Sequence, residues 1–144
     1  MPIMFNDLMH LSPEEIANSK VEFNIRAGKK GEYFIERWLR HNNDEIIDGT
    51  CFDCSYWKWE KPGQIVFSFL RVADDKWIFV SAARIIEVRN GEVVKVEIVS
   101  ECKKYFGRLL VRYKKPSWNY VYNLSSQINN MIVEGIADSF ECFC

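Results

Sequence analysis

Positive charge is concentrated in one segment, from Glu101 to Lys115. The segment holds six cations and one anion, in a chain of 144 residues whose formal net charge is -1, so the rest of the chain is acidic. A one-sided row of cations on a strand suits contacts with phosphate groups. The alternative is a solvated strand face on which lysines prevent edge-to-edge aggregation. The candidate nucleic-acid-binding residues are Lys103, Lys104, Arg108, Arg112, Lys114 and Lys115.

Alternation decides which of these cations share a face. Residues two apart on a strand point the same way, so Arg108, Arg112 and Lys114 should project together. The intervening apolar positions should then face the core; these are Leu109, Val111 and Tyr113.

Aromatic residues form two dense rows. The first precedes the Pro62-Gly63 turn, and the second begins at Trp118 and continues through Tyr120 and Tyr122. Flat rings that are partly exposed near a turn can stack on nucleic-acid bases. We expect one row to belong to the core and the other to be partly open. The candidates for base stacking or partner contact are Tyr56, Trp57, Trp59 and Trp118.

Signals of catalysis are weak. The chain contains no GxGxxG, GxxxxGK[ST], HExxH or GxSxG motif. Its two histidines, His10 and His41, lie beside polar residues, and its paired carboxylates fall in caps and turns. We therefore expect no enzyme activity, no catalytic residue and no cofactor.

Four of the five cysteines could in principle hold zinc. Cys51 and Cys54 form a CxxC, and Cys142 and Cys144 form a CxC. The second spacing is short for a zinc site, and no glycine or basic residue supports either turn. We expect ordinary thiols and no metal. Five cysteines without a secretory signal favour a cytoplasmic protein with reduced thiols.

The composition indicates one globular domain. Hydrophobic residues make up 48% of the chain and aromatic residues 15%, which excludes a disordered chain. No apolar run approaches the roughly 18 residues of a membrane span, so no membrane partner is expected. We divide the domain into a helical part (1–48), a β-rich part (49–136) and a short C-terminal tail (137–144).

Local signals place helices first. Ser12-Pro13-Glu14-Glu15 is a capping box that should open a short helix ending near Asn18. Alternation then predicts a strand at 21–25. Apolar residues at helical spacing predict a helix at 32–43, with another helical turn through Ile46 and Ile47.

Strands follow the helices. Turn residues at Asp74-Asp75 and at Asn90-Gly91 separate the predicted strands 65–70, 77–80, 85–88 and 93–99. Further strands are predicted at 108–113, 118–122 and 131–136, with a short helix at 123–130. Consecutive hairpins favour an antiparallel sheet. The expected fold is α+β, with N-terminal helices packed on a strongly bent, mostly antiparallel sheet or small β-barrel of about six strands.

Several segments resemble the N-terminal region of a family of bacterial GIY-YIG nucleases. The matching segments are Phe5-Asn6-Asp7-Leu8, Ser12-Pro13-Glu14-Glu15-Ile16, Lys61-Pro62-Gly63-Gln64, Asp75-Lys76-Trp77 and Tyr105-Phe106-Gly107-Arg108-Leu109. In that family the region is an accessory domain, and the nuclease half that follows it carries the Tyr, Arg and Glu that cut DNA. This chain contains no GIY or YIG tripeptide, so no catalytic residue is carried over.

The resemblance implies an accessory module of a nuclease or defence system. Together with the basic segment and the aromatic rows, it favours a non-catalytic module that binds DNA or another nucleic acid, including a modified base. The alternative is a protein-interaction module, or a phage or mobile-element inhibitor, that binds a nuclease or defence complex. Trp, Tyr and Arg, which dominate protein interfaces, would then serve a protein partner.

Overall fold

The structure is a computed structural model of the chain. It describes residues 2–24, 46–48, 61–90, 92–117, 119 and 121–138. The α-helices are α1 (Phe5–Met9), α2 (Pro13–Asn18) and α4 (Leu124–Gln127), and the 3-10 helices are η2 (Ser100–Tyr105) and η3 (Ile128–Asn130). The strands are β1 (Lys20–Asn24), β2 (Ile46–Asp48), β3 (Ile65–Ala73), β4 (Lys76–Arg89), β5 (Glu92–Ile98), β6 (Leu109–Arg112), β7 (Val121–Asn123) and β8 (Ile132–Ile136).

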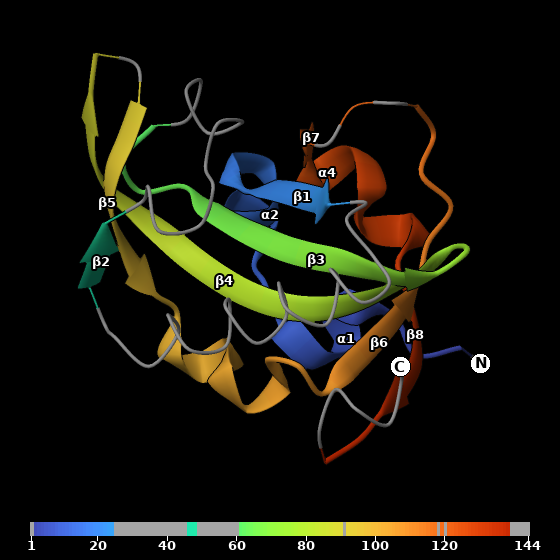
Figure 1. Ribbon diagram of the computed structural model, residues 1–144. Helices are drawn as coiled ribbons and strands as arrows, with labels where there is room; N and C mark the ends of the chain where they lie inside the picture. The colour runs from blue at the N-terminus through green and yellow to red at the C-terminus, as the bar shows by residue number, and fades with distance from the viewer. Residues whose placement is uncertain are drawn as a thin grey trace.

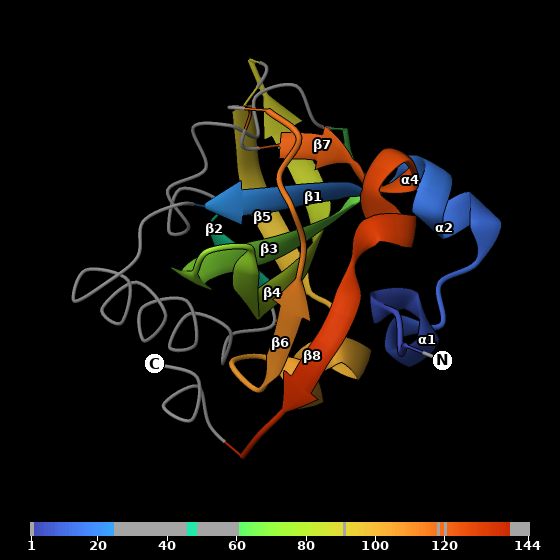
Figure 2. The same ribbon diagram turned by 90° about the vertical axis from the view of Figure 1, so that its right-hand side faces the viewer.

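The strands form one curled sheet. Its main path runs β2-β5-β4-β3-β1-β7, and β6 and β8 branch from β4. The pairing of β1 with β3 is parallel, whereas the other pairings between the named strands are antiparallel. Figure 1 shows the sheet bent into a half-barrel, and Figure 2 shows α1, α2 and α4 gathered on one side of it. The expected α+β fold with a strongly bent, mostly antiparallel sheet is confirmed.

Strand β4 organises the sheet because it pairs with three other strands. One edge pairs with β3, while the other edge pairs with β6 near its start and with β5 near its end. The register shifts between Ser68 and Phe69 in β3 and between Ile85 and Glu87 in β4. Such bulges increase local twist and bend a sheet. The bulges therefore help β4 to pair with both β6 and β5 along the same edge.

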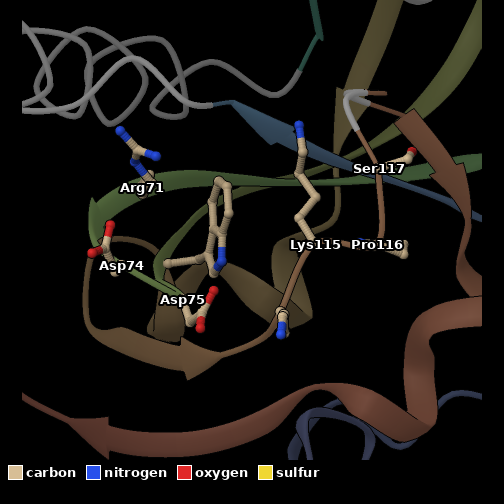
Figure 3. Close-up of a pocket in the computed structure, with 8 residues that line it drawn as sticks. Arg71, Asp74, Asp75, Lys115, Pro116 and Ser117 are labelled. Atoms are coloured by element: carbon tan, nitrogen blue, oxygen red, sulfur yellow. The ribbon is translucent and has the colours of Figure 1, made fainter.

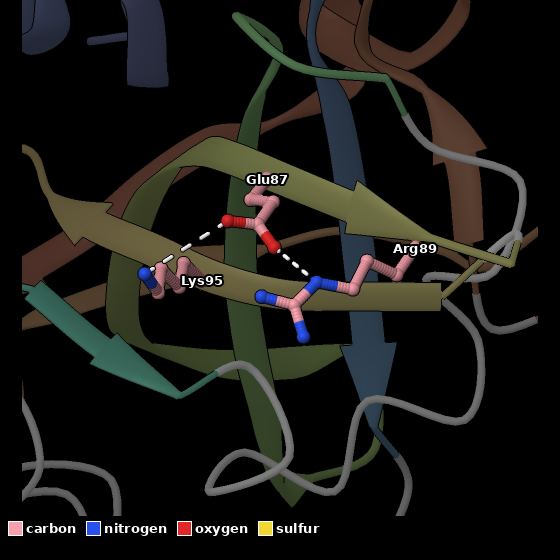
Figure 4. A network of polar contacts seen from close by, with 3 residues as sticks. All are labelled: Glu87, Arg89 and Lys95. Atoms are coloured by element: carbon pink, nitrogen blue, oxygen red, sulfur yellow. Dashed lines mark hydrogen bonds and ion pairs between the residues drawn. The ribbon is translucent and has the colours of Figure 1, made fainter.

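The hairpin of β4 and β5 joins the two strands at Asn90, as predicted. Asn90 has a φ of 52°, in the left-handed region that Asn tolerates. Near the turn, Glu87 contacts Arg89 on its own strand and Lys95 on β5, with 3.8 Å between Lys95 Nζ and Glu87 Oε1 (Figure 4). These side chains are partly exposed, so the pairs add little to stability.

Helix α2 begins and ends where the sequence predicts, whereas helix α1 was not predicted. The Ser12 hydroxyl accepts a hydrogen bond from the Glu15 N–H at 3.1 Å, and Glu15 Oε1 accepts one from the Ser12 N–H at 3.0 Å. This reciprocal pair is the predicted capping box of α2. No helix in the described part of the chain has the length and apolar character needed to cross a membrane.

Aromatic rings fill the space between α1 and the sheet. Phe5 of α1 is fully buried, and its ring meets those of Phe67, Phe69 and Phe79 edge to face at centroid distances of 5.3–5.7 Å. Edge-to-face contacts at this distance are favourable beyond simple area burial. Phe5 therefore fixes a helix of one and a half turns that could not be stable alone.

Some sequence predictions about strands were wrong. The described residues alone form eight strands of the sheet, where about six were expected. Ile46 and Ile47 lie in strand β2, which pairs with β5, and not in a helical turn. The predicted strands 77–80 and 85–88 are one continuous strand, β4. In both places sheet pairing overrides the local signal.

Other predictions have mixed outcomes. The 3-10 helix η2 was not predicted. The predicted helix at 32–43 and the tail beyond Asp138 lie outside the described residues. The predicted strand at 118–122 is found as β7, over Val121–Asn123.

Replacing Phe5 with Ala should lower the free energy of unfolding by about 3–5 kcal/mol, because it leaves a cavity among three rings. Chemical denaturation measures this change. Ile3→Ala is the matched control, because Ile3 is 52% exposed and its truncation should change stability by no more than about 0.5 kcal/mol. Equal losses for both variants would contradict the central role of Phe5.

Cys102 should make stability fall in alkaline solution. Burial, and then the nearby carboxylates of Glu101 and Glu15, raise the pKa of the Cys102 thiol from 9.0 to about 11. The folded state therefore favours the protonated thiol, and the unfolded state loses its proton at lower pH. The contribution is complete below pH 9 and is lost as the pH rises to about 11, at a cost of about 2–3 kcal/mol.

Denaturation of the wild type and of Cys102→Ala across this pH range tests the prediction. The variant should lack this part of the pH dependence, while the contribution of the tyrosines remains in both proteins. Parallel pH curves would contradict it.

Candidate nucleic-acid interface

The predicted basic residues are spread over two ends of β6. Lys103 and Lys104 lie on η2, Arg108 lies in the turn before β6, and Arg112 is the last residue of β6. Lys114 and Lys115 follow the strand. The apolar alternation is confirmed, since Leu109, Val111 and Tyr113 are buried. However, Leu110 is also buried, so the cations do not form one continuous face.

Arg108 stabilises the turn in which it lies. Its Nε donates to the Ala137 carbonyl at 3.0 Å, and its Nη1 donates to the Lys104 carbonyl at 3.1 Å. Its Nη2 lies 3.8 Å from an Asp138 carboxylate oxygen. Just before it, Gly107 has a φ of 74°, which favours glycine. Arg108 therefore ties the end of η2 to the residues that follow β8.

Arg112 shares a carboxylate with a cation from β4. Glu134 of β8 lies 3.5 Å from Arg112 Nε and 3.8 Å from Lys76 Nζ. At the other end, the Lys104 ammonium sits 5.2 Å from the centre of the Tyr105 ring. The positive charge near Arg108 and Arg112 is thus partly balanced by acids that lie much later in the sequence.

Lys114 and Lys115 line a pocket at the other end of β6. The pocket has a volume of about 530 Å³. Its lining residues are Arg71, Asp74, Asp75, Trp77, Lys114, Lys115, Pro116 and Ser117. In Figure 3, Arg71 of β3 and Asp74 and Asp75 of the β3–β4 turn lie on one side of the pocket. Lys115, Pro116 and Ser117 come from the segment after β6 and lie on the other side. Its charged groups are three cations and two carboxylates.

A layer of aromatic side chains holds the two sides of this pocket together. The Tyr113 ring stacks on the Phe23 ring, with centroids 4.1 Å apart and an interplanar angle of 7°. The Trp77 Nε1–H donates to the Tyr113 carbonyl at 2.9 Å. The Tyr113 N–H in turn donates to the Asp75 carbonyl at 2.9 Å. The turn that carries the carboxylates is therefore fixed to the strand that leads to the lysines.

Two ionisable groups at this end of the sheet, Lys115 in the pocket and Tyr113 beside it, have shifted pKa values. Partial burial, and then the positive charge of Arg71, lower the pKa of Lys115. Burial, and then Tyr122, raise the pKa of the Tyr113 hydroxyl, which remains protonated at neutral pH. That hydroxyl donates to Gln127 Oε1 at 2.6 Å. Tyr113 is therefore a structural support rather than an acid or base for catalysis.

A second polar feature crosses the opposite face of the sheet. Glu22, Ser68 and Ser81 occupy adjacent register positions on β1, β3 and β4, and all three are buried. The Ser68 hydroxyl has no hydrogen-bond partner among the described residues. This polar row was not predicted, because only the pairing of the three strands brings the residues together.

Several predicted site residues cannot be placed. Tyr56, Trp57, Trp59, Trp118 and Tyr120 lie outside the described residues, as do the zinc candidates Cys51, Cys54, Cys142 and Cys144. Cys102 is a buried free thiol. The described parts of the chain bring together no group of three His, Cys, Asp or Glu side chains that could hold a metal ion.

The sequence interpretation missed half of the pocket. Arg71 lies just beyond the predicted strand 65–70, Trp77 opens the predicted strand 77–80, and Asp74-Asp75 is predicted only as a turn. Trp77 is indeed almost fully buried, with 3% of its surface exposed. The one available signal was the presence of two carboxylates in a tight turn between the predicted strands 65–70 and 77–80.

Scans against protein-family models, curated proteins and solved structures found no match to this chain. The structure itself defines the class of the protein as an α+β domain with a curled half-barrel sheet. The resemblance to the GIY-YIG nuclease family remains a prediction.

Replacing Tyr113 with Phe should lower the free energy of unfolding by about 1–3 kcal/mol, because Gln127 loses its buried donor. The ring itself would still stack on Phe23. Chemical denaturation measures the effect, with Tyr105→Phe as the control because Tyr105 lies on η2, at the other end of β6 from the pocket. If Tyr113→Phe is as stable as the wild type, the hydroxyl does not brace this end of the sheet.

Proposed function

We propose that this protein is a non-catalytic module that binds nucleic acid through the pocket end of β6. The observation that carries the proposal is the meeting of Arg71, Lys114 and Lys115 around one pocket. Cations grouped in this way suit phosphate groups, which dominate the affinity of proteins for nucleic acids. The nearby Arg112 and Lys76 add two further cations on β6 and β4, which share the one carboxylate of Glu134.

A protein partner is less well supported. Large exposed hydrophobic side chains in the described part of the chain are Ile3, Ile86 and Ile136. Ile86 lies near the far end of β4, whereas Ile136 ends β8. A protein-binding site usually needs a contiguous apolar patch with aromatic anchors. We further propose, from the sequence resemblance, that the module accompanies a nuclease or defence system.

Binding should be salt-dependent and should weaken when Lys114 becomes Gln. Fluorescence anisotropy of a labelled single strand and its duplex, at about 50 mM and about 200 mM salt, measures both effects. Lys114→Gln removes one exposed cation, so the slope of log affinity against log salt should fall by about 0.7–0.9. Lys61→Gln is the matched control, because Lys61 is exposed near the opposite end of β3.

A second variant should change affinity in the opposite direction. Glu134→Gln removes the carboxylate that faces Arg112 and Lys76, so affinity and salt dependence should both increase. The function proposed here is wrong if the wild type binds neither nucleic acid at low salt, or if its binding does not depend on salt. The assignment to this surface is wrong if Lys61→Gln and Lys114→Gln behave alike.

A further inference from the structure

We propose that the pocket accepts one unpaired nucleotide, with its phosphate between Arg71 and Lys115 and an amino group of its base on Asp74 or Asp75. This inference rests on the proposed function and names the part of the nucleic acid that enters the site. It predicts two properties that simple phosphate binding lacks: a preference for unpaired strands and a preference among bases.

The phosphate position follows from two cations that line the same pocket. Arg71 and Lys115 are both half-buried, and they come from opposite sides of the pocket (Figure 3). The repulsion between them contributes to the lowered pKa of Lys115. An anion placed between two like charges relieves this repulsion and gains hydrogen bonds from both. A phosphate group offers the oxygen acceptors that such an arrangement needs.

The base preference follows from the carboxylates. Ionised Asp side chains accept hydrogen bonds and cannot donate them. Adenine, cytosine and guanine carry exocyclic amino donors, whereas thymine carries carbonyl acceptors at the corresponding places. Asp75 is held in a left-handed conformation, with a φ of 57°, and its carbonyl is fixed by the Tyr113 N–H. The turn therefore presents its carboxylates from a rigid position.

The size and wall of the pocket suit one nucleotide. Its volume of about 530 Å³ lies within the range of about 300–1,000 Å³ that is usual for sites of small ligands. Trp77 contributes apolar surface only, because its N–H is already bonded to the Tyr113 carbonyl. A base that is paired within a duplex keeps its amino group engaged and its ring stacked. An unpaired base is free to enter.

Titration calorimetry with free nucleotides tests the pocket directly. The probes are the 5′-monophosphates of deoxycytidine, deoxyadenosine and thymidine, together with deoxycytidine and inorganic phosphate. We expect the deoxycytidine and deoxyadenosine monophosphates to bind more tightly than thymidine monophosphate. Deoxycytidine without phosphate, and phosphate without a nucleoside, should each bind at least about tenfold more weakly.

Substitutions separate the two halves of the site. Lys115→Gln should weaken the binding of all three monophosphates by about tenfold or more, whereas Lys61→Gln should leave it unchanged. The double variant Asp74→Asn, Asp75→Asn should abolish the preference over thymidine monophosphate. Asn tolerates the left-handed backbone of position 75, and thermal unfolding checks that each variant is folded.

The outcomes distinguish this inference from the proposed function. If DNA binds with salt dependence but no monophosphate binds at millimolar concentration, the pocket proposal is overturned and the function remains. If inorganic phosphate binds as tightly as the nucleotides, or if the Asn variants keep the base preference, the nucleotide assignment is also overturned. If neither DNA nor monophosphates bind, both proposals are wrong.

Discussion

The stacking of Tyr113 on Phe23 is the contact on which the pocket end of the molecule depends. It joins the residue that follows β6 to a residue near the end of β1, and these two strands do not pair with each other. Trp77 of β4 packs edge-on against the same Phe23 ring and donates to the Tyr113 carbonyl. Four of the charged residues that line the pocket are sequence neighbours of this aromatic group, and the fifth, Arg71, is the register partner of Trp77. Asp75 lies two residues before Trp77, and Lys114 directly follows Tyr113. The packing of these aromatic rings therefore also fixes the positions of the charged residues.

Strand β4 determines the curvature of the sheet, and this curvature brings the aromatic residues of the pocket end together. Because it pairs with β6 at its start and with β5 at its end, the sheet must curl around it. The helices lie on one side of the curled sheet (Figure 2). There the Phe5 ring of α1 packs against rings from β3 and β4. The turn at Asp74-Asp75 is left at one end of the sheet, open to solvent. A fold of this kind places its rigid core directly under an exposed charged turn, which suits a binding site.

Structural features that depend on neighbouring residues could be predicted from the sequence, whereas pairings between distant segments could not. The capping box of Ser12 and Glu15 and the hairpin at Asn90 depend on residues a few positions apart, so their side chains alone specify them. The parallel pairing of β1 with β3 and the short strand β2 depend on distant partners, and a local pattern cannot indicate them. The same limit applies to the site. The basic segment was visible, but its acidic partners Glu134 and Asp138, and its pocket partner Arg71, lie elsewhere in the chain.

The distribution of acids changes what the basic segment can do. A uniform cationic face would bind any polyanion, and its affinity would depend on charge alone. In this protein Glu134 and Asp138 balance the cations around β6, and two carboxylates stand beside the remaining cations at the pocket. Acids in that place repel a continuous phosphate backbone, but they provide acceptors for a ligand that combines a phosphate with amino donors. The near-neutral net charge is therefore consistent with the proposed site, which would bind polyanions in general more weakly but would select a single nucleotide.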